Sequence, residues 1–284
     1  MKLHIENGVL MGLQNEIICP GREEQFVDLV IPDTVQAIAN DAFSGWRELC
    51  SVVIPGSVKK IGKRAFTYCR NLEEVVICEG VEVIDDSAFQ DSPSIEVTLP
   101  EHSLKRIGRN TFANTLFRQI SLPDGVEEIG AGAFRRSYIE KVVIPGSTRM
   151  VPDDAFRDCQ YLETVILQDG VETIGESGFE NCSRIAELLL PRTLKKIGVR
   201  AFCSTFLERI DLPTHIEEIG DEAFRGSTFD SQATEPVFEL PKSMKRIGKD
   251  AFDCLYGRRV LLPQILKGKG ECAFPCCEVT YCPE

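Results

Sequence analysis

The chain has 284 residues, of which 43% are hydrophobic and 27% charged, a composition typical of a globular protein that excludes disorder over most of its length. Its 44 acidic and 32 basic residues give a net charge of −12, which disfavours nucleic-acid binding because phosphate backbones would be repelled. No apolar run approaches the roughly 18 residues of a membrane span, and the start MKLHIENGVLMGLQ lacks a signal-peptide core. The sequence therefore predicts a cytoplasmic protein without membrane insertion, or a surface or secreted one if the chain is a fragment.

The first predicted element is a β-hairpin. Asn7 and Gly8 stand between two apolar stretches, which is a strong signal for a two-residue hairpin turn. We expect residues 1–25 to form an N-terminal capping hairpin that covers the open end of the structure that follows.

From residue 26 onward the sequence repeats itself. The segment from Ile61-Gly62 to Phe66 recurs along the chain, and the repeat is most easily counted by its phenylalanine. Eleven copies are spaced 22 or 23 residues apart with one interval of 28: Phe43, Phe66, Phe89, Phe112, Phe134, Phe156, Phe179, Phe202, Phe224, Phe252 and Phe274. The long interval contains a turn-rich insertion, residues 226–234, that should bulge from the surface.

Each repeat contains two short extended pieces and a tight turn. Leu49, Val52 and Ile54 alternate as the inward positions of a strand that a proline ends. A second extended piece covers residues 58–61, and residues 65–69 are too short for a proper helix and indicate a single helical or 3-10 turn.

A unit of 23 residues is too small to bury such an apolar face alone, so stacked neighbours must supply the core. The pattern predicts an α/β-type, strand-rich, right-handed solenoid over residues 26–277, with residues 278–284 as a C-terminal tail or cap. One strand per repeat at the ladder spacing of about 4.8 Å would give a curved parallel sheet over eleven rungs, backed by a spine of phenylalanines.

The motif L-x-x-V-x-I-P-x-x-V-x-x-I-G-x-x-A-F-x-x-C, carried by residues 26–274, resembles the BspA-like (Treponema-type) leucine-rich repeat family, a bacterial and protist class. The resemblance implies a leucine-rich repeat fold and a protein-binding or adhesion module. It implies no catalytic residue and no cofactor, because the family motif is structural throughout.

Charged residues alternate in sign from repeat to repeat at the two positions after Val58 and its equivalents. Opposite charges on neighbouring rungs would lie about 5 Å apart, which stabilises the register. The series is Lys59 and Lys60, Glu82, Lys105 and Arg106, Glu127 and Glu128, Arg149, Glu172, Lys195 and Lys196, Glu217 and Glu218, and Lys245 and Arg246. A second interpretation is a charged docking strip, although such surface pairs are usually solvated.

The twelve cysteines are not arranged as a disulfide framework. Several lie three residues after a repeat phenylalanine, where a thiol can act as a small hydrophobic core group: Cys69, Cys159, Cys182 and Cys277. We expect free thiols in a reducing compartment.

The C-terminal cysteines Cys272, Cys276, Cys277 and Cys282 are the only candidates for metal binding. Their C-x3-C-C-x4-C spacing is not the paired C-x2-C of tetrahedral zinc sites, which favours a capping segment. The three histidines, His4, His102 and His215, fall in the leader and in turns of different repeats, so the sequence indicates no catalytic triad and no metal site.

The exposed face of a solenoid sheet is its usual binding surface. The outward residue between the last two inward positions of each strand is mostly aliphatic: Val30, Val53, Val76, Thr98, Ser121, Val143, Ile166, Leu189, Asp211, Glu239 and Leu261. The predicted partner-binding residues are Val53, Val76, Val143, Ile166 and Leu189 with the flanking Lys141, Glu187 and Arg209. Strand propensity alone would also account for these β-branched residues.

The first hypothesis is a non-enzymatic protein-protein interaction module, monomeric, that presents a concave parallel sheet to an unknown protein or peptide. The alternatives are a structural spacer or self-associating scaffold, and an enzyme or metal-binding protein that uses its Cys-rich C-terminus or the insertion at residues 226–234.

Overall fold

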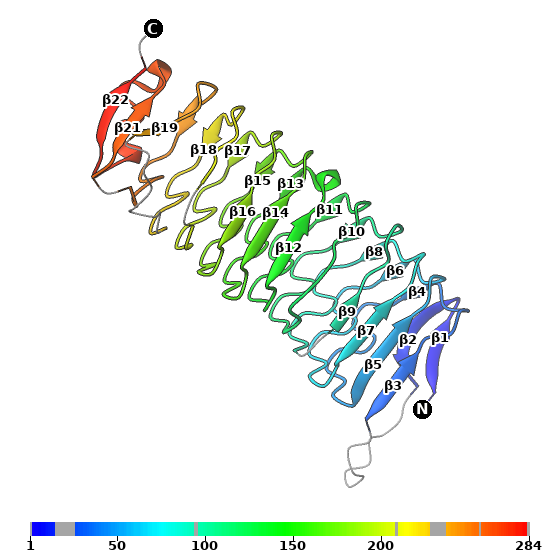
Figure 1. The fold of residues 1–284 in the computed structure, drawn as a ribbon. Coiled ribbons are helices and arrows are strands. Elements are labelled where there is room, and N and C mark those ends of the chain that lie inside the picture. The colour runs from blue at the N-terminus through cyan, green and yellow to red at the C-terminus, as the bar shows by residue number, and fades with distance from the viewer. Residues whose placement is uncertain are drawn as a thin grey trace. The chain divides into compact units, whose positions relative to one another are not determined.

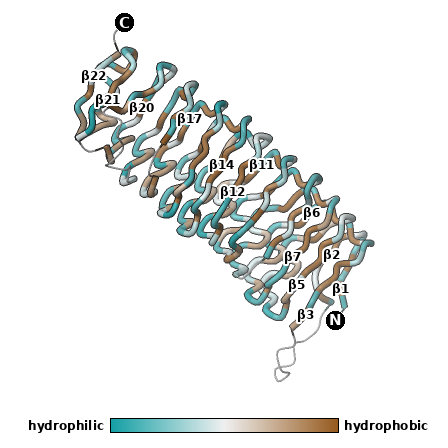
Figure 2. Tube along the Cα trace, viewed as in Figure 1, coloured by the Kyte–Doolittle hydropathy of each residue, from teal (hydrophilic) through white to brown (hydrophobic). Residues whose placement is uncertain are grey.

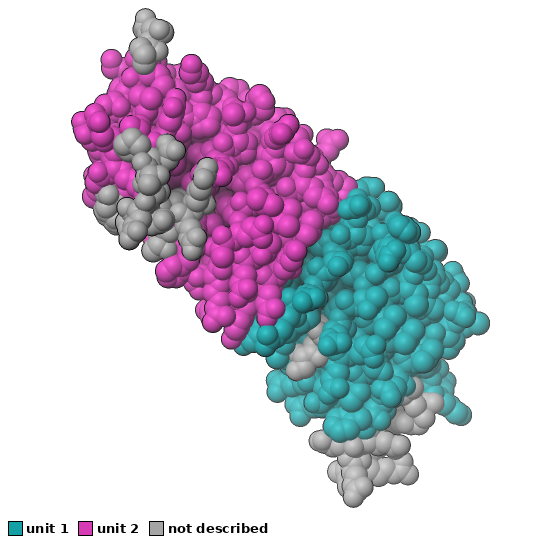
Figure 3. All heavy atoms as spheres, in the orientation of Figure 1, with its two compact units in different colours: residues 1–139 teal, residues 140–284 magenta. Residues whose placement is uncertain are grey.

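A computed structural model describes residues 2–14, 26–93, 96–207, 210–227, 237–255 and 257–282. The chain divides into two compact units, Met1–Ile139 (unit 1) and Glu140–Glu284 (unit 2), which Figure 3 colours separately. Each unit is a parallel β-solenoid, in which every turn of the chain adds strands to those of the preceding turn (Figure 1). No helix in the described part of the chain is long and apolar enough to span a membrane.

Unit 1 opens with the predicted hairpin. Strands β1 (Leu3–Glu6) and β2 (Val9–Leu13) are antiparallel. The φ angles of Asn7 and Gly8 between them are 49° and 78°, the left-handed conformation that a tight two-residue hairpin turn requires. Leu10 of β2 is fully buried, and β2 pairs in parallel with the first short strand, so the hairpin covers the end of the unit 1 solenoid as expected. The rest of the predicted cap, residues 15–25, lies outside the described residues.

Each solenoid turn contributes a long and a short strand, as the sequence predicts. The long strands of unit 1 are β3 (Val27–Val30), β5 (Leu49–Ile54), β7 (Glu74–Ile77) and β9 (Glu96–Thr98). Its short strands are β4 (Ala37–Ile38), β6 (Lys60–Ile61), β8 (Val83–Ile84), β10 (Arg106–Ile107) and β11 (Glu128–Ile129), which continue the hairpin sheet.

Unit 2 has the same construction. Its long strands are β12 (Lys141–Ile144), β14 (Thr164–Leu167), β16 (Glu187–Leu189), β19 (Val237–Glu239), β21 (Arg259–Leu262) and β22 (Glu278–Tyr281). Its short strands are β13 (Met150–Val151), β15 (Thr173–Ile174), β17 (Lys196–Ile197), β18 (Glu218–Ile219) and β20 (Arg246–Ile247). Three 3-10 helices complete the described elements: η1 (Gly146–Thr148), η2 (Gln264–Leu266) and η3 (Glu271–Ala273).

The core of each unit is the predicted stack of inward side chains. Leu49, Val52 and Ile54 are fully buried, and hydrophobic and hydrophilic residues alternate along each turn (Figure 2). Within each unit the repeat phenylalanines stack ring on ring with centroids 4.9 to 5.6 Å apart, for example Phe66 on Phe89 at 5.2 Å and Phe179 on Phe202 at 5.2 Å. This offset stacking adds to the free energy gained by burying each ring.

The segment around most of the repeat phenylalanines, for example Phe66, is a pair of turns instead of the expected helical or 3-10 turn, whereas the 3-10 helix η3 lies directly before Phe274. Arg64 and Tyr68 have φ angles of 53° and 58°, which interrupt any helix. The N–H groups of Arg64, Phe66 and Tyr68 donate to carbonyls of the next turn of the solenoid at 2.8 to 3.0 Å. Because these donors bond to the neighbouring rung, too few remain to build a local helix.

The continuous sheet over eleven rungs that the sequence predicts is not formed. The long strands make three separate sheets, β3-β5-β7-β9 in unit 1 and β12-β14-β16 and β19-β21-β22 in unit 2. After β9, residues 120–123 are not strand, and the same is true of residues 210–213 between β16 and β19.

Both interruptions follow a loop that is one residue shorter than the loop between β5 and β7. Ile120 and Ile210 lie eight residues after Phe112 and Phe202, whereas Val75 lies nine residues after Phe66. The same eight-residue interval separates Phe89 from Val97 and Phe252 from Val260, yet β9 still pairs with β7 and β21 with β19. A shorter loop therefore accompanies the interruptions but does not by itself cause them.

Two other expectations concern the C-terminal part of the chain. Residues 278–281, which the sequence assigns to a C-terminal tail or cap, form β22 and pair in parallel register with β21. The predicted surface insertion at residues 226–234 lies outside the described residues except for Gly226 and Ser227.

Candidate functional site

Three aliphatic side chains form a row on the outward face of the unit 2 sheet. Val143, Ile166 and Leu189 occupy equivalent positions on β12, β14 and β16, and the parallel register pairs each with the next. Adjacent strands lie about 4.8 Å apart, so these side chains form one apolar strip across the strands. Val143 and Ile166 are half-buried by their neighbours, whereas Leu189 on the last strand of the sheet is 50% exposed. We call these three residues the unit 2 row.

Polar side chains border the unit 2 row two positions earlier on the same strands. Lys141 and Glu187 are exposed, and Thr164 lies between them in the ladder. The Thr164 hydroxyl donates a hydrogen bond to the Glu187 carboxylate at 3.3 Å. The structure therefore brings together five of the eight predicted partner-binding residues on one sheet. Arg209, predicted to continue this border, lies outside the described residues.

Unit 1 has an equivalent row of three valines. Val30, Val53 and Val76 are paired in register on β3, β5 and β7. Val30 is 69% exposed, and Val53 and Val76 are half-buried. The border of this row is acidic and includes Asp28, which accepts a hydrogen bond from the Ser51 hydroxyl at 2.7 Å. We call the three valines the unit 1 row.

The predicted aliphatic face is thus divided into short rows, each three strands wide. Ser121 and Asp211, which the sequence places in the same outward position, lie in the two segments where the strand ladder is interrupted. Glu239 and Leu261 are paired on β19 and β21 in the C-terminal sheet. The binding role of the rows stays a prediction.

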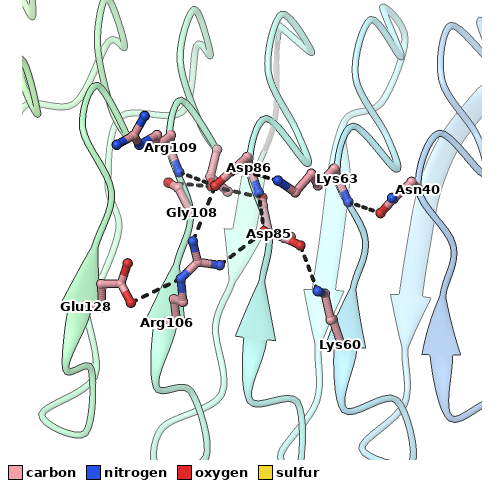
Figure 4. Close-up of polar contacts among 10 residues, drawn as sticks. Asn40, Lys60, Lys63, Asp85, Asp86, Arg106, Gly108, Arg109 and Glu128 are labelled. Atoms are coloured by element: carbon pink, nitrogen blue, oxygen red, sulfur yellow. Dashed lines mark hydrogen bonds and ion pairs between the residues drawn. The ribbon is translucent and has the colours of Figure 1, made fainter.

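A second polar site, which the repeat pattern does not predict, lies in the short-strand sheet of unit 1 (Figure 4). Asp85 is almost fully buried and lies 2.8 Å from the Lys60 ammonium and 3.1 Å from the Arg106 guanidinium. Arg106 also reaches Asp86 at 3.4 Å and Glu128 at 3.1 Å. Arg106 therefore links three successive turns of the solenoid, and the pair of Asp85 with Lys60 adds a fourth.

The hydrogen bonds of this cluster compensate for the burial of the Asp85 carboxylate. Burial by itself would raise the pKa of Asp85, but hydrogen bonds from Lys60, the Asp86 N–H and Arg106 outweigh it and lower this pKa to about 2. Asp85 is therefore ionised at neutral pH and fully partnered, which suits a structural ion pair better than a proton-transfer group. The sequence signal was present, because Asp85 stands where seven other repeats have the glycine of their Ile-Gly pair.

The predicted alternation of charges along the short strands is confirmed within each unit. Side chains of opposite sign face each other on neighbouring rungs: Lys59 and Glu82 at 3.8 Å, Lys105 and Glu127 at 3.9 Å, Lys195 and Glu172 at 2.8 Å, and Lys245 and Glu217 at 2.8 Å. These pairs are largely exposed, so each contributes modestly and together they favour one register.

Three of the four cysteines predicted to lie in the core do so, and the fourth, Cys277, is only half-buried. The repeat cysteines also make hydrogen bonds. Cys69, Cys159 and Cys182 are fully buried, and burial raises the pKa of Cys69 to about 12, so it is a thiol at neutral pH. Cys69 donates its S–H to the Phe43 carbonyl at 3.2 Å. Other repeats place a serine or threonine at this position with the same role, as Ser92 donates to the Phe66 carbonyl at 2.7 Å. The exchange of Cys with Ser and Thr was a sequence signal for a buried donor.

The C-terminal cysteines differ in their contacts and in their exposure. Cys277 donates to the Leu255 carbonyl at 2.7 Å, Cys272 contacts the Lys269 carbonyl at 3.3 Å, and Cys276 is exposed. Across the described residues, no three His, Cys, Asp or Glu side chains come together as a metal site. His4 contacts Glu6 and His102 lies near Glu101, each on the surface of a different element.

The parallel turns, the stacked phenylalanines and the leucine, valine and isoleucine core define a leucine-rich repeat solenoid. The chain belongs to the BspA type leucine rich repeat family, whose repeat region is matched in six copies across residues 22–139, 105–231 and 227–283. The resemblance noted from the repeat motif is thereby confirmed.

Solved structures of leucine-rich repeat proteins are similar to this chain. The T. pallidum protein TpLRR is 24% identical, with 72% of this chain and 85% of that chain covered and a TM-score of 0.50. A Bacteroides ovatus leucine-rich repeat protein is 21% identical, with 99% and 97% covered and a TM-score of 0.48. The pneumococcal vaccine antigen PcpA is 17% identical, with 99% and 95% covered and a TM-score of 0.42. No curated protein matches the chain.

Proposed function

We propose that this protein is a non-enzymatic interaction module that binds a polypeptide partner on its outward strand rows. The family supports the general class, because leucine-rich repeat scaffolds of this type suggest protein-interaction or adhesion modules and are generally not enzymes. The observation that carries the proposal is the unit 2 row, three aliphatic side chains in strict register bordered by Lys141 and Glu187.

The chemistry of the row favours a polypeptide. Exposed apolar surface rimmed by charge is typical of protein-binding sites, where apolar side chains provide affinity and charges provide orientation. Both signs of charge are available at the border, since Lys141 and Glu187 lie on either side of Thr164. Neither described row contains an aromatic residue, which disfavours a stacking platform for sugars.

The test is a triple variant of the unit 2 row. Replacing Val143, Ile166 and Leu189 by lysine should abolish partner binding and leave the fold intact, because these side chains point outward and contribute little to the core. Partners are isolated from native lysate by affinity capture, identified, and then titrated as purified proteins against the wild-type protein and the variant. Circular dichroism checks that the variant is folded.

A matched control separates surface charge from the row itself. Replacing Gln160, Ser183 and Val199 by lysine adds the same charge outside the row and should leave binding unchanged. Unchanged binding by the folded row variant would remove the proposal. Concentration-dependent oligomers without a saturable partner would favour the spacer or self-associating scaffold instead.

The compartment is a separate proposal. The buried cysteines fill core positions as hydrogen-bonding thiols, which supports a reducing, cytoplasmic environment. Thiol titration after denaturation without reductant should find nearly all twelve cysteines reactive. Several protected pairs would contradict this assignment.

A further inference from the structure

The interruption of the long-strand ladder in unit 1 opens a groove. Its walls are the end of β9 with the turn that follows, residues 97–102, and the equivalent segment of the next turn, residues 119–125. The volume of the groove is about 770 Å³, within the range of roughly 300 to 1,000 Å³ typical of ligand sites. We call it the unit 1 breach. In Figure 1, β9 is the last strand of its sheet.

The floor of the breach is the hydrophobic core itself. Leu99, Ile120 and Leu122 occupy inward positions but are 9%, 7% and 8% exposed, whereas the equivalent Val52 and Ile54 on a paired strand are at 0%. Apolar side chains are thus accessible from outside where the strands separate. This arrangement favours an apolar side chain of a ligand, because its burial would complete the covering of the core.

The breach also leaves backbone groups without their ladder partners. On the paired strands, the Ile31 N–H donates to the Val53 carbonyl of the next turn at 3.1 Å. The equivalent groups, the Leu99 N–H and the Ser121 carbonyl, make no such bond with each other. A donor and an acceptor therefore lie on opposite walls of the breach. An extended peptide backbone offers a carbonyl and an N–H that match them, as in strand addition to a sheet edge.

Charge defines the end of the breach near the turns. Glu101 and Asp124 line it, with His102, and none of its thirteen lining residues is lysine or arginine. The Lys105 ammonium lies close to Gly125 at this end of the breach, but it is paired with the Glu127 carboxylate at 3.9 Å, so Glu101 and Asp124 leave an excess of negative charge there. A ligand carrying a positive charge at this end would therefore be attracted.

We propose that the unit 1 breach binds an extended polypeptide segment that contains an apolar residue followed or preceded closely by a lysine or arginine. The segment adds to β9 through its backbone, places the apolar side chain on Leu99, Ile120 and Leu122, and directs the basic side chain to Glu101 and Asp124. The breach and the unit 2 row share no residue, so peptide binding at the breach does not depend on partner binding at the row.

The experiment uses random dodecapeptides displayed on phage and selected on the wild-type protein, followed by titration of the synthetic winning peptides. Peptides with an apolar residue beside a lysine or arginine should be enriched. The double change Thr98→Lys and Ser121→Lys, at the rim of the breach and outside the core, should weaken their binding by at least about tenfold. N-methylation of the peptide backbone should have a similar effect, because it removes the donors needed for strand addition. The Leu99 amide should exchange quickly in the free protein and slowly with peptide bound.

Matched controls come from rungs where the ladder is intact. The double change Ser51→Lys and Thr164→Lys adds the same charge on β5 and β14 and should leave peptide affinity unchanged. The triple lysine variant of the unit 2 row should also bind the selected peptides normally, which separates this site from the proposed function.

Failure to select any peptide, enrichment of acidic peptides, or equal affinity of the Thr98→Lys and Ser121→Lys variant would each overturn the proposal.

Discussion

The position three residues after each phenylalanine shows how a single side chain satisfies the backbone of this fold. The phenylalanine carbonyl faces the closed core, where a hydrogen bond to water is unavailable, so a side-chain donor can add to the backbone bond that the carbonyl accepts, as from the Trp46 N–H to the Phe43 carbonyl at 3.1 Å. Cys69 and Ser92 donate to the phenylalanine carbonyl of the preceding repeat, whereas Thr205 donates to the Phe202 carbonyl of its own repeat. The role of a buried thiol as a small hydrophobe is therefore only half of its contribution.

A pair of substitutions at Cys69 tests the donor role. Cys69→Ser keeps a donor to the Phe43 carbonyl, whereas Cys69→Val keeps apolar volume and removes the donor. We expect the serine variant to be more stable than the valine variant by about 1 kcal/mol, the usual net contribution of a buried hydrogen bond. Urea unfolding of both variants gives the free energies. A valine variant of equal or greater stability would mean that only apolar volume matters.

Asp85 makes the stability of unit 1 depend on pH. Its pKa is about 2 in the folded protein against an ordinary value of 3.8, so its ionised form favours the folded state. This contribution, about 2 kcal/mol, is fully present above about pH 4 and is lost as the pH falls towards 2. Unfolding measured between pH 5 and about 2 should therefore show a smaller loss for Asp85→Asn than for the wild type. Parallel pH profiles for the two proteins would contradict the role of this carboxylate.

At the scale of strands, the register of the short-strand sheets is supported by charges that alternate between rungs. Glu127 and Glu128 of the β11 rung face Lys105 and Arg106 of the β10 rung at 3.9 and 3.1 Å. Apolar pairing alone would allow a turn of the solenoid to pair with the wrong neighbour, because all turns have similar inward residues. The charges discriminate because like signs would then be brought together.

Reversing this rung tests the alternation. The double change Glu127→Lys and Glu128→Lys replaces attraction to Lys105 and Arg106 with repulsion, and should lower the free energy of unfolding by about 1 to 2 kcal/mol at low salt. Thermal melting in low and in high salt gives the measurement, since about 1 M salt should remove most of the difference by screening. If the variant and the wild type melt at the same temperature at low ionic strength, the alternating charges do not contribute to stability.

The long-strand ladder is interrupted twice, after Phe112 and after Phe202. In both places the inward strand residue lies eight residues after the phenylalanine, but the same interval after Phe89 and after Phe252 keeps the ladder intact. Around the interruptions the inward residues are more exposed than Val52 and Ile54, as Leu99 and Ile120 in unit 1 and Leu190 and Ile210 in unit 2 show. The spacing in the sequence therefore does not by itself decide where the solenoid wall opens.

At the scale of the whole molecule, each unit is a one-dimensional stack in which every turn contacts its neighbours in sequence. The phenylalanine stack is the most continuous part of each core. Phe179 lies 5.3 Å from Phe156 and 5.2 Å from Phe202 and is fully buried, so removing it affects three turns at once.

Replacing Phe179 by alanine should cost about 3 to 5 kcal/mol, because the truncation leaves a cavity between two rings that the backbone ladder holds apart. Phe206→Ala is the matched control. Phe206 is 55% exposed, and its loss should change stability by less than about 0.5 kcal/mol. Chemical denaturation of both variants gives the comparison, and a similar small effect for the two would contradict the spine as a main source of stability.

Much of the fold could be predicted from the sequence because the repeats can be aligned with one another, which shows the positions that are apolar in nearly every copy. The inward positions Val52 and Ile54, the phenylalanine spine and the Asn7-Gly8 hairpin follow from local periodicity and turn chemistry, and all are present in the structure. The outward rows could be predicted in part, since Val143, Ile166 and Leu189 do share one sheet. The helical turns could not, because the left-handed φ angles and the bonds between rungs around Phe66 depend on the neighbouring turn.

The sequence by itself determined that this protein is a leucine-rich repeat solenoid, since a short repeat with a fixed apolar pattern buries its face only by stacking. Only the tertiary structure decided where the stack is imperfect. The interval after Phe112 is shorter by one residue, but whether a ladder absorbs or breaks at such a site depends on the alignment of two backbones in space. The same holds for Asp85, whose partners Lys60 and Arg106 lie 25 and 21 residues away in the chain and become neighbours only because successive turns are stacked.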